Sequence, residues 1–293
     1  MKKTLLISLL LLIFKFSYAQ EYPVQITDQG YIIVEVTLID SIKANFILDT
    51  GAGAIVLSAK TFDKVKNKAI NSGYVTGFRN DGDRIDGEIY KIPSFAIGDI
   101  IQKDVLIGIY PPLDDYGVDG LVSLKFFEDK PFNIDFKNKK ITFLNKEDLQ
   151  NLKNNNTSVP ITLQVQSDFS IDIFIRVCLN NGVSVNAEFD TGSGFNTFLV
   201  NPYFMEKLRL DKSGMQSKEF TTPISGKILT EYKTVLDSVR ICTDTDISDK
   251  QISENIPVVF RENLIYEALI GSFLFKNGNI TIDIPNKEVI IGD

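Results

Sequence analysis

Two short strings in this sequence place an acidic residue at the end of a strand-like run and follow it with a turn. They are Asp49-Thr50-Gly51-Ala52-Gly53 and Asp190-Thr191-Gly192-Ser193-Gly194. Burial beside apolar residues disfavours the ionised form of a carboxylate, so an aspartate is unexpected at such a position. Two such aspartates that face one another can share a proton, and paired acids of this kind act on a water molecule. The sequence therefore makes Asp49 and Asp190 the candidate catalytic pair.

The surroundings of the two strings repeat as well. Aligning Asp49 with Asp190 also aligns Val36-Thr37-Leu38 with Val177-Cys178-Leu179, without a gap. A slightly longer shift aligns Leu121-Val122-Ser123 with Leu269-Ile270-Gly271 and residues 133–139 with 281–287. A single Asp-Thr-Gly is readily explained as a turn after a strand, because Asp and Gly favour turns. A repeat of this length instead indicates a duplicated domain.

The composition excludes several other kinds of site. The 293 residues include no histidine, which removes Ser-His-Asp and Cys-His nucleophiles and histidine-ligated zinc. Two cysteines are too few to build a thiolate cage for a metal. The net charge of −7 argues against a nucleic-acid partner, because such binding needs a basic surface. Carboxylate chemistry, which needs neither metal nor cofactor, is the hydrolytic chemistry that remains.

The N-terminus is typical of a secretory signal peptide. Two lysines precede an apolar run from Leu5 to Phe14, and Ser17-Tyr18-Ala19 supplies the small residues of a cleavage site. We predict cleavage after Ala19 and an exported protein, periplasmic or secreted, with no stable membrane anchor. An uncleaved anchor is the minor alternative, since the run is short for a membrane span. Export permits a disulfide, so Cys178 and Cys242 either form a bridge or are small core residues.

Alternating apolar residues place each candidate aspartate at the end of a β-hairpin. Residues 30–49 and 171–189 both alternate, and the second pair of strands turns at Asn180-Asn181-Gly182, a strong hairpin signal. Short helices are expected at 58–69 and 202–212. Each half then closes with a short helix and a final hairpin, at 132–144 and 280–291. The polar stretch around Asn154-Asn155-Asn156 is expected to link the halves.

With these features, the sequence resembles the aspartic peptidase clan, and more closely its retropepsin-like bacterial members. The resemblance rests on an apolar stretch ending in Asp-Thr-Gly-Ala/Ser in both halves, and on a later apolar pair followed by a small residue. It implies an all-β fold of two homologous closed-barrel lobes with a few short helices, fused in one chain. We therefore expect an N-terminal lobe at 20–148, a linker at 149–157 and a C-terminal lobe at 158–293, working as a monomer.

The resemblance also implies an activity, that of an aspartic endopeptidase acting on a peptide or protein substrate. Asp49 and Asp190 would hold a water molecule, one as general base and the other as the protonated partner that polarises the carbonyl. The residues implied to support the two carboxyl groups are Thr50, Gly51, Thr191, Gly192 and Ser193. The alternative from another class is a peptide-binding or adhesion protein that retains the bilobal β fold without turnover.

Two differences between the halves lead to further expectations. Ser193 can donate a hydrogen bond to Asp190, whereas Ala52 cannot do so for Asp49, so we predict that Asp190 is the ionised base. Ser123 stands where the second motif has glycine, and we expect it to alter the loop beneath Asp49.

A flap that covers the substrate is also implied by the resemblance. The glycine-rich, polar stretch from Gly73 to Tyr90 is our candidate, with Gly77, Phe78 and Gly82 as its flap residues. Residues 221–231 are its counterpart in the second half.

Overall fold

Alternating side chains form the hairpins that the sequence predicts. A computed structural model describes residues 20–166, 168–180, 182–242 and 253–292, so the predicted signal peptide at 1–19 and Asn181 lie outside the described residues. In β3 (Ile32–Leu38) and β4 (Ile42–Leu48), every second side chain is buried. The hairpin of β13 (Ser170–Leu179) and β14 (Val183–Phe189) repeats this arrangement in the second half.

The N-terminal lobe is a closed barrel. Its strands are hydrogen-bonded in the order β3, β4, β9, β5, β8 and β7, and β7 pairs back with β3. Closure leaves the ring without free edges, and large apolar side chains such as Phe46 and Phe95 are buried in this lobe. The remaining strands of this lobe are β2 (Gln25–Ile26), β5 (Val56–Leu57), β6 (Ile70–Phe78), β7 (Arg84–Ile97), β8 (Ile100–Ile109) and β9 (Gly120–Val122).

The C-terminal lobe closes in the same way. Its ring runs β13, β14, β19, β15, β18 and β17, and β17 pairs back with β13. The Cys178–Cys242 disulfide lies at this closure, with Cα atoms 5.8 Å apart, so the bridged alternative is the one the structure contains. The prediction of two closed β lobes is confirmed. The remaining strands of this lobe are β15 (Phe198–Val200), β16 (Gln216–Thr221), β17 (Ile228–Ile241), β18 (Ser253–Arg261) and β19 (Ala268–Ile270).

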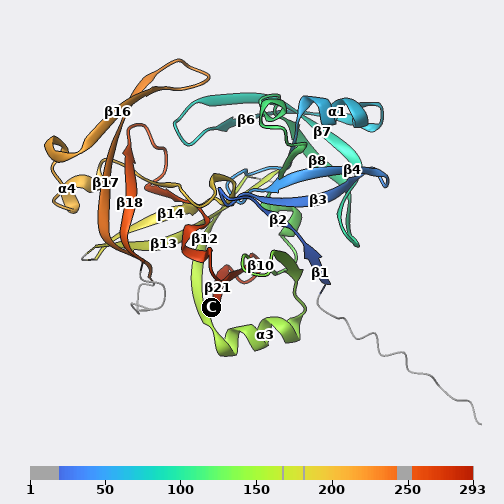
Figure 1. Ribbon diagram of the computed structural model, residues 1–293. Helices are drawn as coiled ribbons and strands as arrows, with labels where there is room; N and C mark the ends of the chain where they lie inside the picture. Colours follow the sequence, from blue (N-terminus) through green and yellow to red (C-terminus); the bar gives the residue numbers. More distant parts are fainter. Residues whose placement is uncertain (1–19, 167, 181, 243–252, 293) are drawn as a thin grey trace, which may run out of the picture.

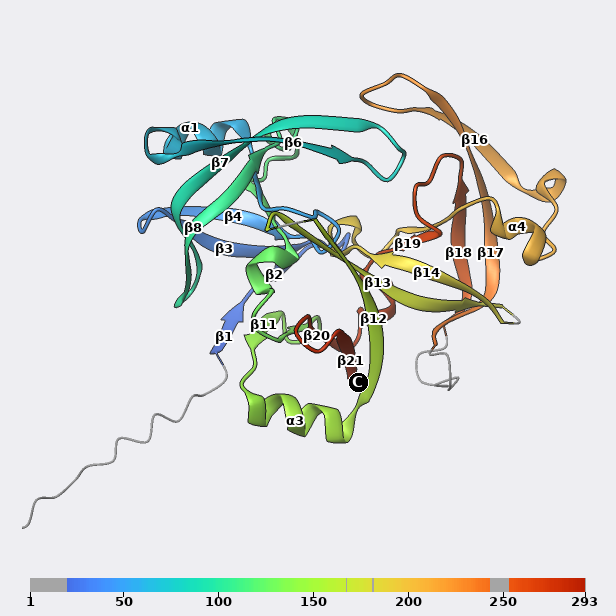
Figure 2. The same ribbon diagram turned by 180° about the vertical axis from the view of Figure 1, so that it is seen from behind.

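The final hairpins of the two halves join the lobes through a shared sheet. β10 pairs with β20 in antiparallel register, Asn133 opposite Thr281, and Asn133 Nδ2 donates to Thr281 Oγ1 at 2.9 Å. Figures 1 and 2 show this sheet below the two lobes, with the C-terminus beside it. Its strands, in order, are β1 (Gln20–Pro23), β11 (Lys140–Phe143), β10 (Phe132–Asp135), β20 (Asn279–Asp283), β21 (Glu288–Gly292) and β12 (Thr157–Gln166).

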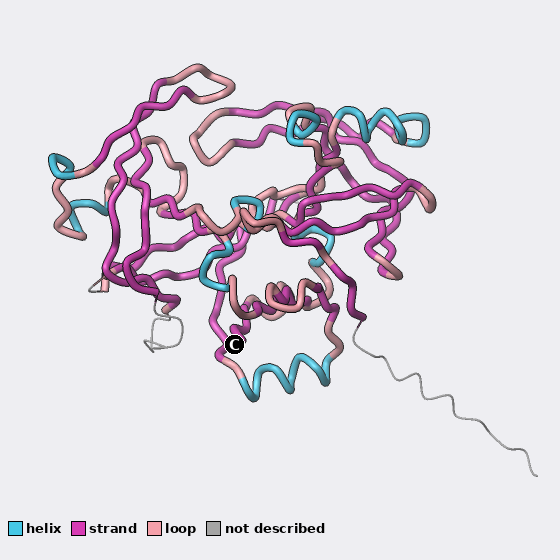
Figure 3. Tube along the Cα trace, viewed as in Figure 1, coloured by secondary structure: helices cyan, strands magenta, loops and turns pink. Residues whose placement is uncertain are grey.

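Helices are short and lie outside the barrels (Figure 3). The stretch expected as a linker at 149–157 forms most of α3 (Lys146–Asn155) and the start of β12, because Asn145 caps the helix by accepting from the N–H groups of Glu147 and Asp148. The other α-helices are α1 (Ala59–Val65), α2 (Leu113–Tyr116) and α4 (Phe204–Lys207). The 3₁₀ turns are η1 (Lys66–Lys68), η2 (Leu124–Phe127), η3 (Thr191–Ser193), η4 (Lys212–Gly214) and η5 (Ser272–Phe275). Within the described ranges, no helix has the length and apolar character needed to cross a membrane.

Candidate active site

Each candidate aspartate directly follows the second strand of a β-hairpin in its lobe. Asp49 comes directly after β4, and its N–H donates to the carbonyl of Val122 at 2.9 Å. Asp190 comes directly after β14, and its N–H donates to the carbonyl of Ile270 at 2.9 Å. β9 and β19, which supply these carbonyls, run parallel to β4 and β14. The later apolar pair in each half therefore fixes the loop that carries the aspartate.

Thr50 and Thr191 connect the two loops across the lobe boundary. Thr50 Oγ1 donates to the carbonyl of Phe189 at 2.5 Å and accepts from the N–H of Thr191 at 3.0 Å. In return, Thr191 Oγ1 donates to the carbonyl of Leu48 at 2.7 Å and accepts from the N–H of Thr50 at 3.1 Å. Both threonines are buried. This reciprocal set of hydrogen bonds holds the aspartate of one lobe at a fixed position relative to the other.

The glycines of the two strings allow the carboxyl groups to meet. A Cβ atom added to Gly192 would lie 2.2 Å from Cγ of Asp49, and one added to Gly51 would lie 2.6 Å from Cγ of Asp190. Neither position can therefore hold a side chain without moving the opposite carboxyl group. The N–H of Gly51 also donates to Oδ1 of its own Asp49 at 3.0 Å. The structure thus brings together the two predicted acids and the glycines predicted to support them.

The two acids differ in their hydrogen bonds. Burial, followed by the nearby charge of Asp190, raises the pKa of Asp49 well above its ordinary value. Burial also raises the pKa of Asp190, but hydrogen bonds from Ser193 and from the N–H of Gly192 act to lower it. Ser193 Oγ donates to Asp190 Oδ2 at 2.5 Å, whereas Ala52 has no hydroxyl to offer Asp49. Hydrogen bonds therefore stabilise the ionised form of Asp190 better than that of Asp49.

Ser123 and Gly271 mark a difference beneath the two loops. A Cβ atom added to Gly271 would lie 2.1 Å from the carbonyl oxygen of Gly194, so that position requires glycine. Ser123 is buried, and its hydroxyl accepts from the N–H of Lys125 at 3.3 Å at the start of η2. The N-terminal lobe thus has room for a hydroxymethyl group where the C-terminal lobe has none.

A cavity of about 500 Å³ contains both acids in its wall. The hairpin of β6 and β7, here called the flap, has the turn 79–83 at its tip, and the tip residues Arg79 and Asn80 line the cavity. Phe78 lines the cavity, although more than half of its surface is exposed. Gly82 lies in the tip turn with a φ of +82°, and Gly77 has no side-chain neighbour that a Cβ would meet. Of the predicted flap residues, Phe78 is thus the one that reaches the cavity.

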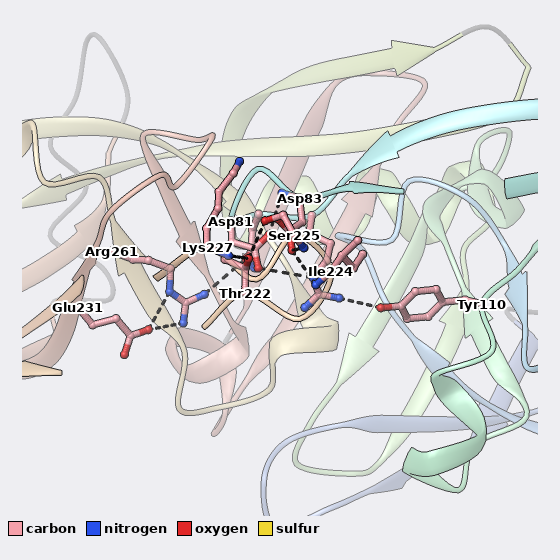
Figure 4. Close-up of polar contacts among 11 residues, drawn as sticks. Asp81, Asp83, Tyr110, Thr222, Ile224, Ser225, Lys227, Glu231 and Arg261 are labelled. Carbon is pink, nitrogen blue, oxygen red and sulfur yellow. Dashed lines mark hydrogen bonds and ion pairs between the residues drawn. The ribbon is translucent and has the colours of Figure 1, made fainter. Parts of the chain in front are cut away.

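The flap tip contacts the opposite lobe through Asp83 (Figure 4). Asp83 Oδ2 accepts from the N–H groups of Ile224 and Ser225 at 2.9 and 3.0 Å, and Oδ1 accepts from the Ser225 hydroxyl. These partners lie in the turn between β16 and β17, the predicted counterpart of the flap. Burial acts to raise the pKa of Asp83, but the hydrogen bonds from Ser225, Ile224 and Thr222 lower it to about 2. We call this contact the flap latch.

Other residues of the tip add to the flap latch. The carbonyl of Asn80 accepts from the N–H of Ile265 at 3.0 Å, in the loop that follows β18. Arg79 contacts residues of its own lobe, since its guanidinium donates to the Tyr110 hydroxyl at 2.8 Å and lies 3.6 Å from Asp81. The tip therefore bridges the two lobes above the cavity.

Glu188 is a cavity residue that the sequence reasoning missed. The stretch 187–189 was expected to be apolar, yet its central residue is a glutamate, and it lies in the wall of the cavity. Alignment of the two repeats puts Glu188 opposite Ile47, and this exchange of an apolar for an acidic residue was the available signal. Asp83 gave no comparable signal, because its partners lie in the other lobe.

Comparisons with known proteins agree with the fold. A family model described as aspartyl protease matches residues 34–126, which include Asp49 and the Leu121-Val122-Ser123 string. The crystal structure of conglutin gamma, a basic 7S globulin from lupine seeds, is similar with a TM-score of 0.55 at 12% identity. That of basic 7S globulin from soybean has a TM-score of 0.52 at 9% identity. Each comparison covers 94% of this chain and 94% of the other. A comparison with curated proteins finds no match. The chain thus has an aspartic-peptidase-like fold, and at these identities the structural likeness extends to the fold alone.

Proposed function

We propose that this chain, whose N-terminal lobe matches an aspartyl protease family model, is an aspartic endopeptidase. The observation that carries the proposal is the pairing of Asp49 and Asp190. Each comes from its own lobe, each lies against the glycine of the opposite string, and both line one cavity. A protein that only binds peptides would need neither acid, and it would gain nothing from burying two carboxyl groups side by side.

In the proposed reaction Asp190 is the general base and Asp49 carries the shared proton. Asp190, whose carboxylate form is supported by the Ser193 hydroxyl, is the acid we assign to accept a proton from water. The water oxygen then attacks the peptide carbonyl carbon, while Asp49 donates its proton to the carbonyl oxygen. Collapse of the tetrahedral intermediate breaks the C–N bond. The proton held by Asp190 passes to the leaving nitrogen, and Asp49 takes back a proton from one hydroxyl of the intermediate, which restores both acids. No bond forms between enzyme and substrate.

The test is cleavage of an unfolded protein between pH 3 and 7 by the chain starting at Gln20. Asp49→Asn and Asp190→Asn are each expected to abolish cleavage, because neither variant can hold one proton between two carboxyl groups. Asp63→Asn is the matched control, since Asp63 is exposed on α1 and pairs only with Lys66 among the described residues. A statine-type transition-state inhibitor should block the wild-type activity.

Two results would contradict the proposal. Cleavage that survives either active-site substitution would remove the shared pair from the mechanism. A folded wild-type protein that cleaves nothing but still binds unfolded peptides would favour the alternative, a peptide-binding or adhesion protein.

We also propose that the protein is exported and acts as a monomer. The signal-peptide pattern of residues 1–19 and the Cys178–Cys242 bridge, which suits an oxidising compartment, support export. One chain supplies both acids, so a second copy is not needed for a complete site. N-terminal sequencing of the exported protein and light scattering in solution test the two statements, and a mature start far from Gln20 or a stable dimer would overturn them.

A further inference from the structure

The two walls of the cavity are built from matching strand positions but differ in chemistry. On the N-terminal side, Ile47 of β4 stands between Ile33 of β3 and Leu121 of β9, and all three line the cavity. On the C-terminal side, Glu188 of β14 stands between Phe174 of β13 and Leu269 of β19. The repeat thus places an isoleucine next to one catalytic aspartate and a glutamate next to the other.

Glu188 is buried without a full set of partners. Only 2% of its surface is exposed, and Oε1 has no hydrogen-bond partner among the described residues. Burial, followed by the charges of Asp190 and Asp172, raises the pKa of Glu188 to about 9. The hydroxyl of Tyr266 is its hydrogen-bonding neighbour, and the Tyr266 ring packs edge-on against Phe174 at 5.5 Å between centroids.

The charged groups that act on Glu188 are acidic. Asp172 is half-buried, and burial, followed by the charge of Asp190, raises its pKa to about 6. Arg79 lines the same cavity but is engaged by Asp81 and Tyr110. In the part of the chain that the structure describes, no lysine or arginine pairs with Glu188. A buried carboxyl group without a cationic partner is expensive to ionise, and an incoming cation would remove that cost.

We propose that Glu188 forms the floor of a subsite for a positively charged substrate side chain, lysine or arginine, next to the bond that is cleaved. A metal ion is not the expected occupant, since the described residues contain no group of three or more acidic or cysteine side chains placed to hold one. The apolar wall around Ile47 takes an apolar side chain on the other side of that bond. The inference rests on the proposed function, because it places the subsite beside the scissile bond.

The experiment measures binding and cleavage separately. Peptides with a reduced amide in place of the scissile bond carry lysine, norleucine or glutamine beside it, on either side in separate series. Their affinities are measured for the wild-type protein, Glu188→Gln and Glu254→Gln, which removes an exposed carboxylate from β18 of the same lobe. Peptides with an ordinary amide and the same sequences are then tested for cleavage.

We expect the wild-type protein to bind the lysine peptide about tenfold more tightly than the norleucine peptide, in one of the two series. Glu188→Gln should bring that ratio close to one, whereas Glu254→Gln should leave it unchanged. Glu188→Ile, which copies the Ile47 wall, should reverse the preference, and it serves as the second variant if the amide is poorly tolerated.

The other outcomes overturn either the inference or the proposed function. Equal or tighter binding of norleucine in both series, or no binding of any peptide, overturns the subsite. A glutamine peptide that binds as well as lysine replaces the cationic ligand with a neutral one. A lysine preference that survives in Glu188→Gln removes Glu188 as its source. A lysine preference in binding without any cleavage leaves the subsite standing and refutes the proposed function alone.

Discussion

Replacing Thr50 with valine is expected to destabilise the protein and to loosen the two halves of the site. Valine has nearly the shape of threonine, so the change removes a hydroxyl group and little packing. Two buried backbone groups then lose their partner: the carbonyl of Phe189, which accepts at 2.5 Å, and the N–H of Thr191, which donates at 3.0 Å. Neither group can reach water, because both belong to the loops that meet between the lobes.

The magnitude follows from the number of groups left unpaired. A buried donor or acceptor without a partner costs about 1–3 kcal/mol, so two of them should lower the free energy of unfolding by about 2–6 kcal/mol. Thr50→Ser keeps the hydroxyl and loses one methyl group, which costs about 1 kcal/mol. The difference between the valine and serine variants therefore isolates the hydrogen bonds.

Urea unfolding at one fixed pH provides the assay, with peptide cleavage measured on the same samples. Thr191→Val should behave like Thr50→Val, because it leaves the carbonyl of Leu48 and the N–H of Thr50 unpaired. Both valine variants should also lose cleavage rate, since the spacing of the two acids depends on these bonds. A Thr50→Val protein whose unfolding free energy lies within about 0.5 kcal/mol of Thr50→Ser would refute the reasoning.

Four further predictions concern other contacts. Ser193→Ala should move the acid limb of the pH–rate profile to higher pH, because the carboxylate of Asp190 loses a hydrogen-bond donor. Ser193→Thr keeps the hydroxyl and should leave the limb in place, and an unmoved limb in the alanine variant would contradict the assignment of Asp190 as the base. Asp83→Asn should speed hydrogen exchange at the flap tip at neutral pH, and equal exchange in the two proteins would contradict the flap latch. The wild type should approach the exchange rate of the variant only as pH falls from about 4 toward 2, where Asp83 becomes protonated. Because the pKa of Glu188 is about 9 in the folded protein and 4.5 in the unfolded chain, the free energy of unfolding of the wild type should fall by about 1.4 kcal/mol per pH unit relative to Glu188→Gln between those values. Urea-stability curves that stay parallel for the two proteins would argue against a buried neutral acid. Replacing Cys178 and Cys242 by serine should lower the free energy of unfolding by about 4 kcal/mol, the loop-entropy cost for a separation of 64 residues. Thermal or urea unfolding measures this difference, and an unchanged stability would show that strand pairing alone closes the barrel.

The sequence was sufficient for the candidate catalytic pair and for the type of fold. Asp49 and Asp190 sit in strings whose strand, turn and glycine are adjacent in the chain, so their geometry is set by local rules of alternation and turns. The resemblance to the aspartic peptidase clan then implied that each lobe closes on itself. The linker was less predictable. Its polar composition indicated a connection between the halves, but not the helix that Asn145 caps there.

Contacts between distant segments were decided by the tertiary structure alone. Asp83 meets Ser225 only because two hairpin tips from different lobes come together, and nothing local to either residue indicates that pairing. In the sequence, Glu188 is simply one charged residue in a predicted strand. Its burial, and the lack of a hydrogen-bond partner for its Oε1 among the described residues, depend on the residues that pack around it in the folded second lobe. The sequence by itself therefore determined which two acids are present and that each lies between the end of a strand and a glycine turn, because those features depend on neighbouring residues. Only the packing of the two lobes determined what surrounds the acids, since desolvation and cross-lobe hydrogen bonds arise when segments far apart in the chain are brought together.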